Sequence, residues 1–338
     1  MLATRTPNIS VVSPCYNEQE SVAELCRRLS DTCKTLVGDE YEIVLVDDGS
    51  ADSTRGKISD ICKSDSHIIG VFLSRNHGHQ LALSAGLQVC RGERIFIIDA
   101  DLQDPPELLG DMMRLMDDEG ADVVYGKRSE RLGESTFKKL SAAVFYRLLN
   151  KLVDVPIPVD TGDFRLMSRR TLAELNRMPE QHRFIRGMVS WIGFRQVPLS
   201  YQRQERLGGE TKYPLKRMLR FAIDAITGFS TVPLRLATYL GFVCSIFGLM
   251  LLGYTAYSYI SGIAIQGWTT LMTVVLVLGS GQLLVLGVIG EYLGRLYIQS
   301  KNRPLFVIEE IVRGAGRDQT SQHRRRLTTT ATSCLRTT

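Results

Sequence analysis

The sequence predicts an α/β protein in which a mostly parallel β-sheet is followed by two membrane-spanning helices. Over about the first 125 residues, short apolar segments typical of strands alternate with helical segments, the pattern of a parallel sheet covered on both faces. Residues 236–290 contain no Asp, Glu, Lys or Arg, whereas charged residues are frequent on either side. The first pattern predicts the sheet, and the second predicts the membrane segment.

Strands are expected where apolar residues run together. The five expected strands lie at residues 9–14, 41–46, 67–73, 93–98 and 121–125. The four expected helices lie between them, at residues 18–36, 53–62, 81–90 and 105–119. In the last helix Pro105 occupies the first turn, where its missing N–H costs little, and Asp104 is expected to cap the helix.

Four polar loops follow these strands, at residues 14–18, 47–50, 74–79 and 99–104. In mostly parallel sheets, ligands bind at the carboxyl ends of the strands. We therefore expect the four loops to converge on one crevice that holds the functional site.

Asp99 and Asp101 come directly after an apolar strand. Two carboxylates in such a place repel each other unless a cation lies between them. Mg²⁺ and Mn²⁺ prefer carboxylate, phosphate and water ligands, so a divalent ion that bridges a diphosphate is the cation to expect. Such an ion neutralises charge on a nucleoside-diphosphate leaving group.

Two other loops offer groups that suit a nucleoside. Asp48 can accept from a nucleobase N–H or a ribose hydroxyl, although an Asp before Gly49 is also typical of a simple turn. Tyr16 can stack on a base, and Asn17 or Glu18 can hold the ribose. The same segment also suits the capped start of a helix.

Residues 236–260 and about 271–292 are each long enough to cross a hydrocarbon core of roughly 30 Å. A short link without basic residues joins them, and Lys and Arg flank only the outer ends of the pair. The positive-inside rule therefore predicts a hairpin with both ends in the cytoplasm; a buried hairpin in a soluble core is the alternative. Small residues in the second span permit close helix packing or contacts in a homo-oligomer.

Residues 214–230 carry apolar side chains on one face and basic side chains largely on the other. This pattern predicts an amphipathic helix at the membrane surface, the alternative being a helix packed on its own domain. The net charge of +5 is mild, and much of the basic excess lies beside the apolar segment. A membrane, rather than nucleic acid, is therefore the expected partner.

The cysteine count argues against a disulfide framework or a zinc site, because the seven Cys are odd in number and form no CxxC pair. The N-terminus lacks an apolar signal segment, so the sheet domain is expected to stay in the cytoplasm.

In chain order, the segments SPCYNE, VDDGS, LSRNHGHQLALSAG, DADLQDPPE, YGKR, TGDFRLMSR and GGETKYP resemble the family 2 glycosyltransferases of the GT-A fold. More narrowly, they resemble the polyprenyl-phosphate branch, and the hairpin resembles that of bacterial bactoprenol glucosyltransferases. The resemblance covers about residues 8–310. It implies a nucleotide-sugar donor, a polyprenyl-phosphate acceptor, a multi-pass protein of the bacterial inner membrane, and a flippase as a partner for the lipid product.

The resemblance also implies roles for single residues. The metal and the donor diphosphate are implied at Asp99, Asp101 and Gln103. The nucleotide-sugar is implied to contact Pro14, Tyr16, Glu18, Asp48 and Asn76. The acceptor phosphate is implied at Arg128, Arg206 and Lys212. The last two frame a Gly-rich segment that resembles a mobile lid, or else forms a solvated basic loop.

By the same resemblance, Asp163 and Asp101 are the implied catalytic residues, with Asp163 as the candidate base. The nucleophile, however, is a phosphate oxygen whose second pKa is about 6, so little proton remains to be removed at neutral pH. Asp163 therefore positions the acceptor, assists a minority protonated form, or is a buried Asp bonded to the backbone or to Arg165.

The expected reaction is inverting transfer of a hexose, with UDP-glucose as first choice, to undecaprenyl phosphate by in-line displacement. UDP-aminoarabinose, UDP-N-acetylhexosamine and GDP-mannose are alternative donors; a polysaccharide synthase and a non-catalytic nucleotide-sugar-binding partner are alternative classes. The expected units are a catalytic domain at 1–212 with a mobile loop near its end, an interfacial helix at 213–231, the hairpin at 232–300, and a cytoplasmic tail at 301–338, largely disordered after about 313.

Overall fold

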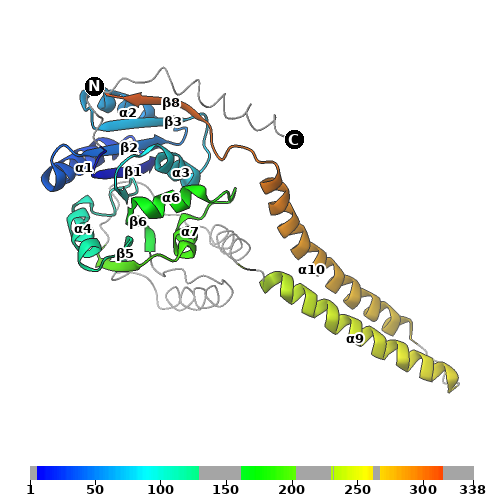
Figure 1. The fold of residues 1–338 in the computed structure, drawn as a ribbon. Helices are drawn as coiled ribbons and strands as arrows, with labels where there is room; N and C mark the ends of the chain where they lie inside the picture. The colour runs from blue at the N-terminus through cyan, green and yellow to red at the C-terminus, as the bar shows by residue number, and fades with distance from the viewer. Residues whose placement is uncertain (1–5, 129–160, 203–229, 231, 262–266, 315–338) are drawn as a thin grey trace, which may run out of the picture.

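The computed structural model describes residues 6–128, 161–202, 230, 232–261 and 267–314. Within these residues the chain forms an α/β domain and a pair of long helices that project from it (Figure 1). The amphipathic helix expected at 213–231 and the Gly-rich loop before it lie outside the described residues, apart from Ser230.

One eight-stranded sheet, in the order β7-β5-β6-β4-β1-β2-β3-β8, organises the domain. Its strands are β1 (Ile9–Cys15), β2 (Tyr41–Asp47), β3 (Ile68–Leu73), β4 (Arg94–Ile97), β5 (Val123–Arg128), β6 (Thr161–Ser168), β7 (Gln196–Tyr201) and β8 (Ile308–Arg313). β1 pairs in parallel with β2 and β4, and β2 with β3. β6 and β8 run antiparallel to their neighbours β4 and β3. The five expected strands are confirmed, and β6, β7 and β8 are additional.

Helices cover both faces of the sheet because successive strand residues point to opposite sides. Val11 faces a cluster with α1, α2 and α4, whereas Val12 faces a cluster with α3, α6 and α7. The helices are α1 (Val22–Val37), α2 (Thr54–Ser64), α3 (His79–Val89), the 3₁₀ turn η1 (Pro106–Leu108), α4 (Leu109–Asp118), α6 (Arg169–Arg177) and α7 (Ile185–Ile192).

The expected capping of helix 105–119 by Asp104 is wrong. The helix starts as η1 without a side-chain cap, and α4 follows it, also without one. Asp104 is fully buried instead, and its Oδ1 accepts a hydrogen bond of 2.5 Å from the hydroxyl of Tyr201 on β7. Gly126 leaves room for that ring, since a Cβ there would lie 2.7 Å from it. Asp104 therefore bonds to the distant Tyr201 and does not cap the helix that follows it.

The expected hairpin consists of α9 (Val232–Ile260) and α10 (Trp268–Ser300), which pack against each other. Both contain stretches long and apolar enough to cross a membrane, at Val232–Leu251 and Val277–Ser300, and almost none of either stretch is buried in the protein. Among the small residues of α10, Gly281 faces α9, because a Cβ there would lie 3.5 Å from Sγ of Cys244.

After α10 the chain returns to the sheet, which was not expected for a segment assigned to a tail. β8 pairs antiparallel with β3, and Arg55 of α2 bonds to Glu309 and Glu310, with distances of 2.8 and 3.3 Å. The segment that follows the hairpin is therefore held to the domain through the sheet (Figure 1).

The loops after β2 and β3 touch at Gly49. This residue has φ +65°, and a Cβ on it would lie 2.6 Å from the carbonyl carbon of Arg75 and 2.7 Å from the backbone nitrogen of Asn76. Gly38 has a similar φ of +61°, yet a Cβ there would meet nothing within 4 Å. At Gly38 only the backbone conformation favours glycine. At Gly49 the close approach of the neighbouring loop favours it as well.

Gly49→Ala is expected to destabilise the domain more than Gly38→Ala. The left-handed conformation costs about 1 kcal/mol for alanine at either position. At Gly49 the backbone of the neighbouring loop must also move, so we expect a total of about 2–4 kcal/mol. Thermal unfolding of the two purified variants in the same detergent tests this. Equal midpoints would contradict the described contact.

Candidate active site

The four polar loops meet at one edge of the sheet, as expected from the parallel pairing of β1 to β4. Asp48 connects two of them. Its Oδ1 accepts from the backbone N–H of His77 at 2.7 Å, and its Oδ2 from that of Gly78 at 2.9 Å. Burial raises the pKa of this carboxyl, and the two amide bonds oppose the rise. Asp48 therefore organises the loop after β3, in addition to any contact it makes with a ligand.

The loop after β1 is held to the loop after β2 through Asn17. This residue adopts a left-handed φ of 55°. Its backbone N–H donates to Oγ of Ser50, and its Oδ1 accepts from the N–H of Ala51, both at 3.0 Å. Next to it, the ring of Tyr16 is 48% exposed. An exposed aromatic ring on a fixed loop is free to stack on a planar ligand.

Pro14, Glu18, Asn76 and Gln103 complete the expected donor contacts. Pro14 is buried at the end of β1, and Asn76 is exposed in the loop after β3. Glu18 accepts a hydrogen bond of 2.7 Å from the hydroxyl of Ser21. Pro14 lies near the end of β1, and the other three lie in the loops that the parallel strands bring to this edge.

A cluster of carboxylates follows β4. Oδ1 of Asp99 is buried without a hydrogen-bond partner among the described residues, and Nε2 of His79 lies 3.5 Å from it. Burial, together with the charges of Asp163, Asp104 and Asp101, raises the pKa of Asp99 to about 6, against the opposing charge of His79. This crowding is the electrostatic condition under which a cation is bound.

The backbone of the same loop is strained between Asp101 and Gln103. Leu102 is buried and adopts a left-handed φ of 58°, which is rare for a residue with a bulky side chain. The backbone N–H of Gln103 donates to Oδ1 of Asp101 at 3.2 Å. Strain of this kind persists where the surrounding structure imposes it, and it is typical of ligand sites.

Asp163 lies at the start of β6, beside the cluster, and only 2% of it is exposed. Its Oδ2 accepts from Nε2 of His79 at 3.0 Å and from Nε2 of Gln80 at 2.8 Å. Its Oδ1 accepts from Nε of Arg186 at 2.8 Å. Burial alone would raise the pKa of Asp163, but Arg186 and His79 together hold it well below its ordinary value.

Asp163 is thus an ionised carboxylate that accepts hydrogen bonds from three side chains. Burial opposes the charged form of His79, yet the bond to Asp163 and the charges of Asp99 and Asp163 raise the pKa of His79 to about 9. Arg165 donates to the backbone carbonyls of Gly162 and Asp163, at 3.2 and 3.3 Å. The partners of the Asp163 carboxylate are therefore not those expected for a simple Asp–Arg165 pair.

The sequence did not single out His79, Gln80 and Arg186. The first two belong to the segment LSRNHGHQLALSAG, from which only Asn76 was selected, so the signal was present. Arg186 lies at the start of α7, in a region for which no element was predicted. Its role depends on a contact across 23 positions of sequence, which local patterns do not reveal.

Of the three residues expected at the acceptor phosphate, one is described. Arg128 ends β5, close to Gly162, where a Cβ would lie 3.1 Å from Nη2 of Arg128. Its Nε is buried without a hydrogen-bond partner in the described part of the chain. Arg206 and Lys212 lie outside the described residues.

A divalent cation fits this site only if a ligand supplies part of its coordination. The described residues contain no group of three or more His, Cys, Asp or Glu placed to hold a metal ion. Within the described ranges, Asp99 nevertheless presents a buried oxygen without a hydrogen bond, two positions before Asp101. Mg²⁺ is commonly bound by one or two carboxylates together with substrate phosphates and water, which matches this arrangement.

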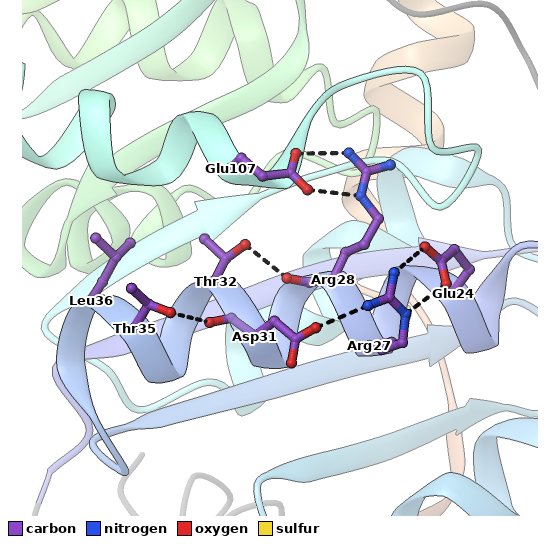
Figure 2. Close-up of a pocket in the computed structure, with 8 residues that line it drawn as sticks. All are labelled: Glu24, Arg27, Arg28, Asp31, Thr32, Thr35, Leu36 and Glu107. Carbon is purple, nitrogen blue, oxygen red and sulfur yellow. Dashed lines mark hydrogen bonds and ion pairs between the residues drawn. The ribbon is translucent and has the colours of Figure 1, made fainter.

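A hollow lies on α1 and η1 (Figure 2). It measures about 660 Å³, and its charged side chains pair with one another. Arg28 bonds to Glu107 at 2.7 and 2.8 Å, and Arg27 to Glu24 and Asp31. None of the expected site residues lines it, so it is not the candidate active site.

Comparison with known proteins agrees with the fold. Residues 10–175 match the family model described as glycosyl transferase family 2, and residues 232–296 match the GtrB C-terminal hairpin. An uncharacterised glycosyltransferase of Bacillus subtilis, YkcC, is 44% identical over 89% of this chain and 93% of its own. A prophage bactoprenol glucosyl transferase homolog of Escherichia coli is 38% identical over 90% of this chain and 99% of its own.

Among solved structures, the mannosyltransferase PcManGT from Pyrobaculum calidifontis, in complex with GDP-Man and Mn²⁺, covers 86% of this chain and 88% of its own. The identity is 17% and the TM-score 0.43, so this likeness says nothing about ligands of the present chain. The family models and the full-length relatives carry the assignment. The chain belongs to glycosyl transferase family 2 and is a membrane-associated glycosyltransferase of the GT-A fold.

Proposed function

We propose that this enzyme transfers glucose from UDP-glucose to a polyprenyl phosphate, undecaprenyl phosphate in bacteria, with inversion at the anomeric carbon. The observation that carries the proposal is the combination of a carboxylate cluster at the sheet edge with a long apolar helix, α10, that is hydrogen-bonded to the loop leading to the partners of Asp163. The relatives named as bactoprenol glucosyl transferases support both the sugar and the lipid acceptor, since they align over nearly their whole length.

The donor is proposed to lie across the loops after β1, β2 and β4. Tyr16 stacks on the uracil, while Pro14, Glu18, Asp48 and Asn76 surround the nucleoside. The diphosphate lies at Asp99, Asp101 and Gln103 together with Mg²⁺ or Mn²⁺. The bound metal supplies positive charge that stabilises the leaving nucleoside diphosphate. The buried Oδ1 of Asp99, which has no hydrogen bond among the described residues, supports this assignment.

The acceptor phosphate is proposed to approach from the side of Arg128 and Arg186, with Arg206 and Lys212 contributing from the Gly-rich segment. Asp163 orients His79 and Arg186 and does not take a proton, because its pKa is held low by these same partners. The lipid phosphate is mostly a dianion at neutral pH and needs little deprotonation. Catalysis then rests on alignment and on charge neutralisation.

Both ends of the hairpin are proposed to face the cytoplasm, which follows from the basic residues that flank it. The lipid phosphate is available only at the membrane surface. A catalytic domain attached to a membrane helix therefore meets its acceptor without searching the cytosol.

The proposed function is tested by transfer from radiolabelled nucleotide sugars to undecaprenyl phosphate in detergent. UDP-glucose is expected to give an organic-soluble product with Mg²⁺ or Mn²⁺ and none with EDTA, and activity should return on adding metal. The panel should include UDP-aminoarabinose, UDP-N-acetylglucosamine and GDP-mannose. A product from one of these alone would mean that this nucleotide sugar, and not UDP-glucose, is the donor. The absence of a lipid product with every donor would contradict the assignment of a polyprenyl phosphate as acceptor.

Asp101→Asn is expected to lower transfer by at least about 100-fold, since a metal-bound carboxylate is lost. The asparagine oxygen can still accept from the N–H of Gln103, so the loop should keep its shape. UDP binding should lose its dependence on Mn²⁺ when measured by calorimetry. Asp118→Asn, at the exposed end of α4, is the control and should behave as wild type. Metal-dependent UDP binding retained in Asp101→Asn would contradict the assignment.

Asp163→Asn is expected to slow transfer by about 10- to 100-fold without changing the shape of the pH profile. Since the pKa of Asp163 is lowered, this carboxyl stays charged throughout the usual assay range. The rate should instead rise through the second pKa of the lipid phosphate, about 6, in both proteins.

The control for this experiment is Asp122→Asn, another buried carboxylate that pairs with an arginine, Arg170, away from the site. It should lower stability and leave transfer per folded molecule unchanged. Loss of the rising limb in Asp163→Asn would show that Asp163 acts as the base.

A further inference from the structure

The outer end of α10 is hydrogen-bonded to the loop between α6 and α7. The side-chain amide of Gln299 contacts this loop twice: its Oε1 accepts from the backbone N–H of Gln181 at 2.9 Å, and its Nε2 donates to the carbonyl of Pro179 at 2.8 Å. The side chain of Gln181 in turn donates to the carbonyl of Arg303 at 2.8 Å. The end of α10 therefore makes two polar contacts with this loop, and the segment after α10 makes a third.

This loop leads directly to the groups that hold Asp163. Four residues after Gln181, the N–H of Ile185 donates to Oε1 of Gln80 at 2.9 Å, and Gln80 bonds to Asp163. Arg186 follows and bonds to Asp163 and to the carbonyl of Thr161, both at 2.8 Å. A continuous chain of contacts thus joins the end of the membrane helix to the active site.

The loop between them is firmly held. Arg183 is buried and donates to the carbonyls of Leu175 and Met178 at 2.7 and 3.3 Å, at the end of α6. A loop fixed in this way transmits the position of α10 to the start of α7. The segment after α10 also reaches the donor side, because the N–H of Ser74 donates to the carbonyl of Val307 at 3.0 Å.

The contact between α10 and the loop lies beyond the start of α9, because α10 is the longer of the two helices at this end. The hydroxyl of Tyr292 donates to the carbonyl of Ser230 at 2.6 Å, so Tyr292 lies level with the start of α9. From there α10 continues to Ser300, which corresponds to about 12 Å of helix beyond that point. Gln299 lies at the tip of this extension, where it contacts the loop between α6 and α7.

We infer that Gln299 and Gln181 are positioning residues that fix the height and orientation of the active site above the membrane. This inference rests on the proposed transfer to a polyprenyl phosphate. A lipid phosphate moves only in the plane of the membrane surface, so small errors in the placement of Arg186 relative to α10 reduce productive encounters with it. An acceptor that is free in water approaches from any direction and does not depend on this placement.

The test compares two acceptors: undecaprenyl phosphate in lipid nanodiscs, and a water-soluble polyprenyl phosphate of about two isoprene units. Gln299→Met keeps the size of the side chain and removes both of its hydrogen bonds. It is expected to lower kcat/KM for the membrane acceptor by about tenfold, and for the soluble acceptor by less than about twofold. The KM for the donor should not change. Gln181→Ala removes only the contact to Arg303 and should give a smaller change in the same direction.

The control is Gln88→Ala, at an exposed position of α3, which should leave both activities unchanged. Equal losses with the two acceptors, or no loss with either, would overturn the inference. A wild-type enzyme inactive with both acceptors would instead contradict the proposed function.

A second measurement does not depend on activity. Amide hydrogen exchange in nanodiscs should be faster at residues 181–186 in Gln299→Met than in wild type, because the acceptor of the Gln181 N–H is lost. Unchanged exchange there would overturn the inference, whatever the acceptor proves to be.

Discussion

The carboxylate of Asp163 is the interaction on which the site depends. It is almost fully buried, and it joins side chains from the start of α3 and the start of α7. Removing such a carboxylate from water is costly unless several donors replace the water, and here three side chains do so. The same bonds keep His79 and Arg186 close to the carboxylates after β4, so that opposite charges alternate across a small region. This arrangement favours binding of phosphate groups together with a metal ion, and it makes Asp163 a poor proton acceptor.

The hairpin is also held in a fixed position relative to the catalytic domain. The chain leaves the domain before α9 and re-enters it as β8, where main-chain pairing with β3 and the contacts of Arg55 hold it. Between these points, the end of α10 bonds to the loop that leads to the Asp163 partners. For an acceptor confined to a membrane, the relation between helix and active site becomes a requirement of the reaction. Two attachments control that relation better than a single flexible linker would.

The first five strands, their helices and the convergence of four loops followed from local patterns, because apolar runs and polar strand ends are read from neighbouring residues. β6 and β7 were not predicted, although TGDFRLMS is an ordinary strand sequence, since no regular alternation with helices surrounds it. β8 was missed for another reason: IEEIVR becomes a strand only through pairing with β3, more than 230 residues earlier. The capping by Asp104 failed in the same way, because Tyr201 supplies a partner that the local sequence does not show.

The site residues also differ in whether the local sequence could predict them. Asp99 and Asp101 were selected because two carboxylates at a strand end have few uses other than binding a cation. His79, Gln80 and Arg186 were not, because their importance arises from a shared partner that is distant in sequence. Family resemblance pointed to Asp163, but only the structure identifies its three donors and the resulting loss of basicity.

The central claim is that a lipid phosphate is the nucleophile. It is tested most directly by ³¹P NMR of the enzyme in nanodiscs with UDP-glucose, a divalent metal and undecaprenyl phosphate. We expect the monoester signal of the lipid to be replaced by a phosphodiester signal in step with the release of UDP. Release of UDP with an unchanged lipid signal and free glucose in solution would contradict it.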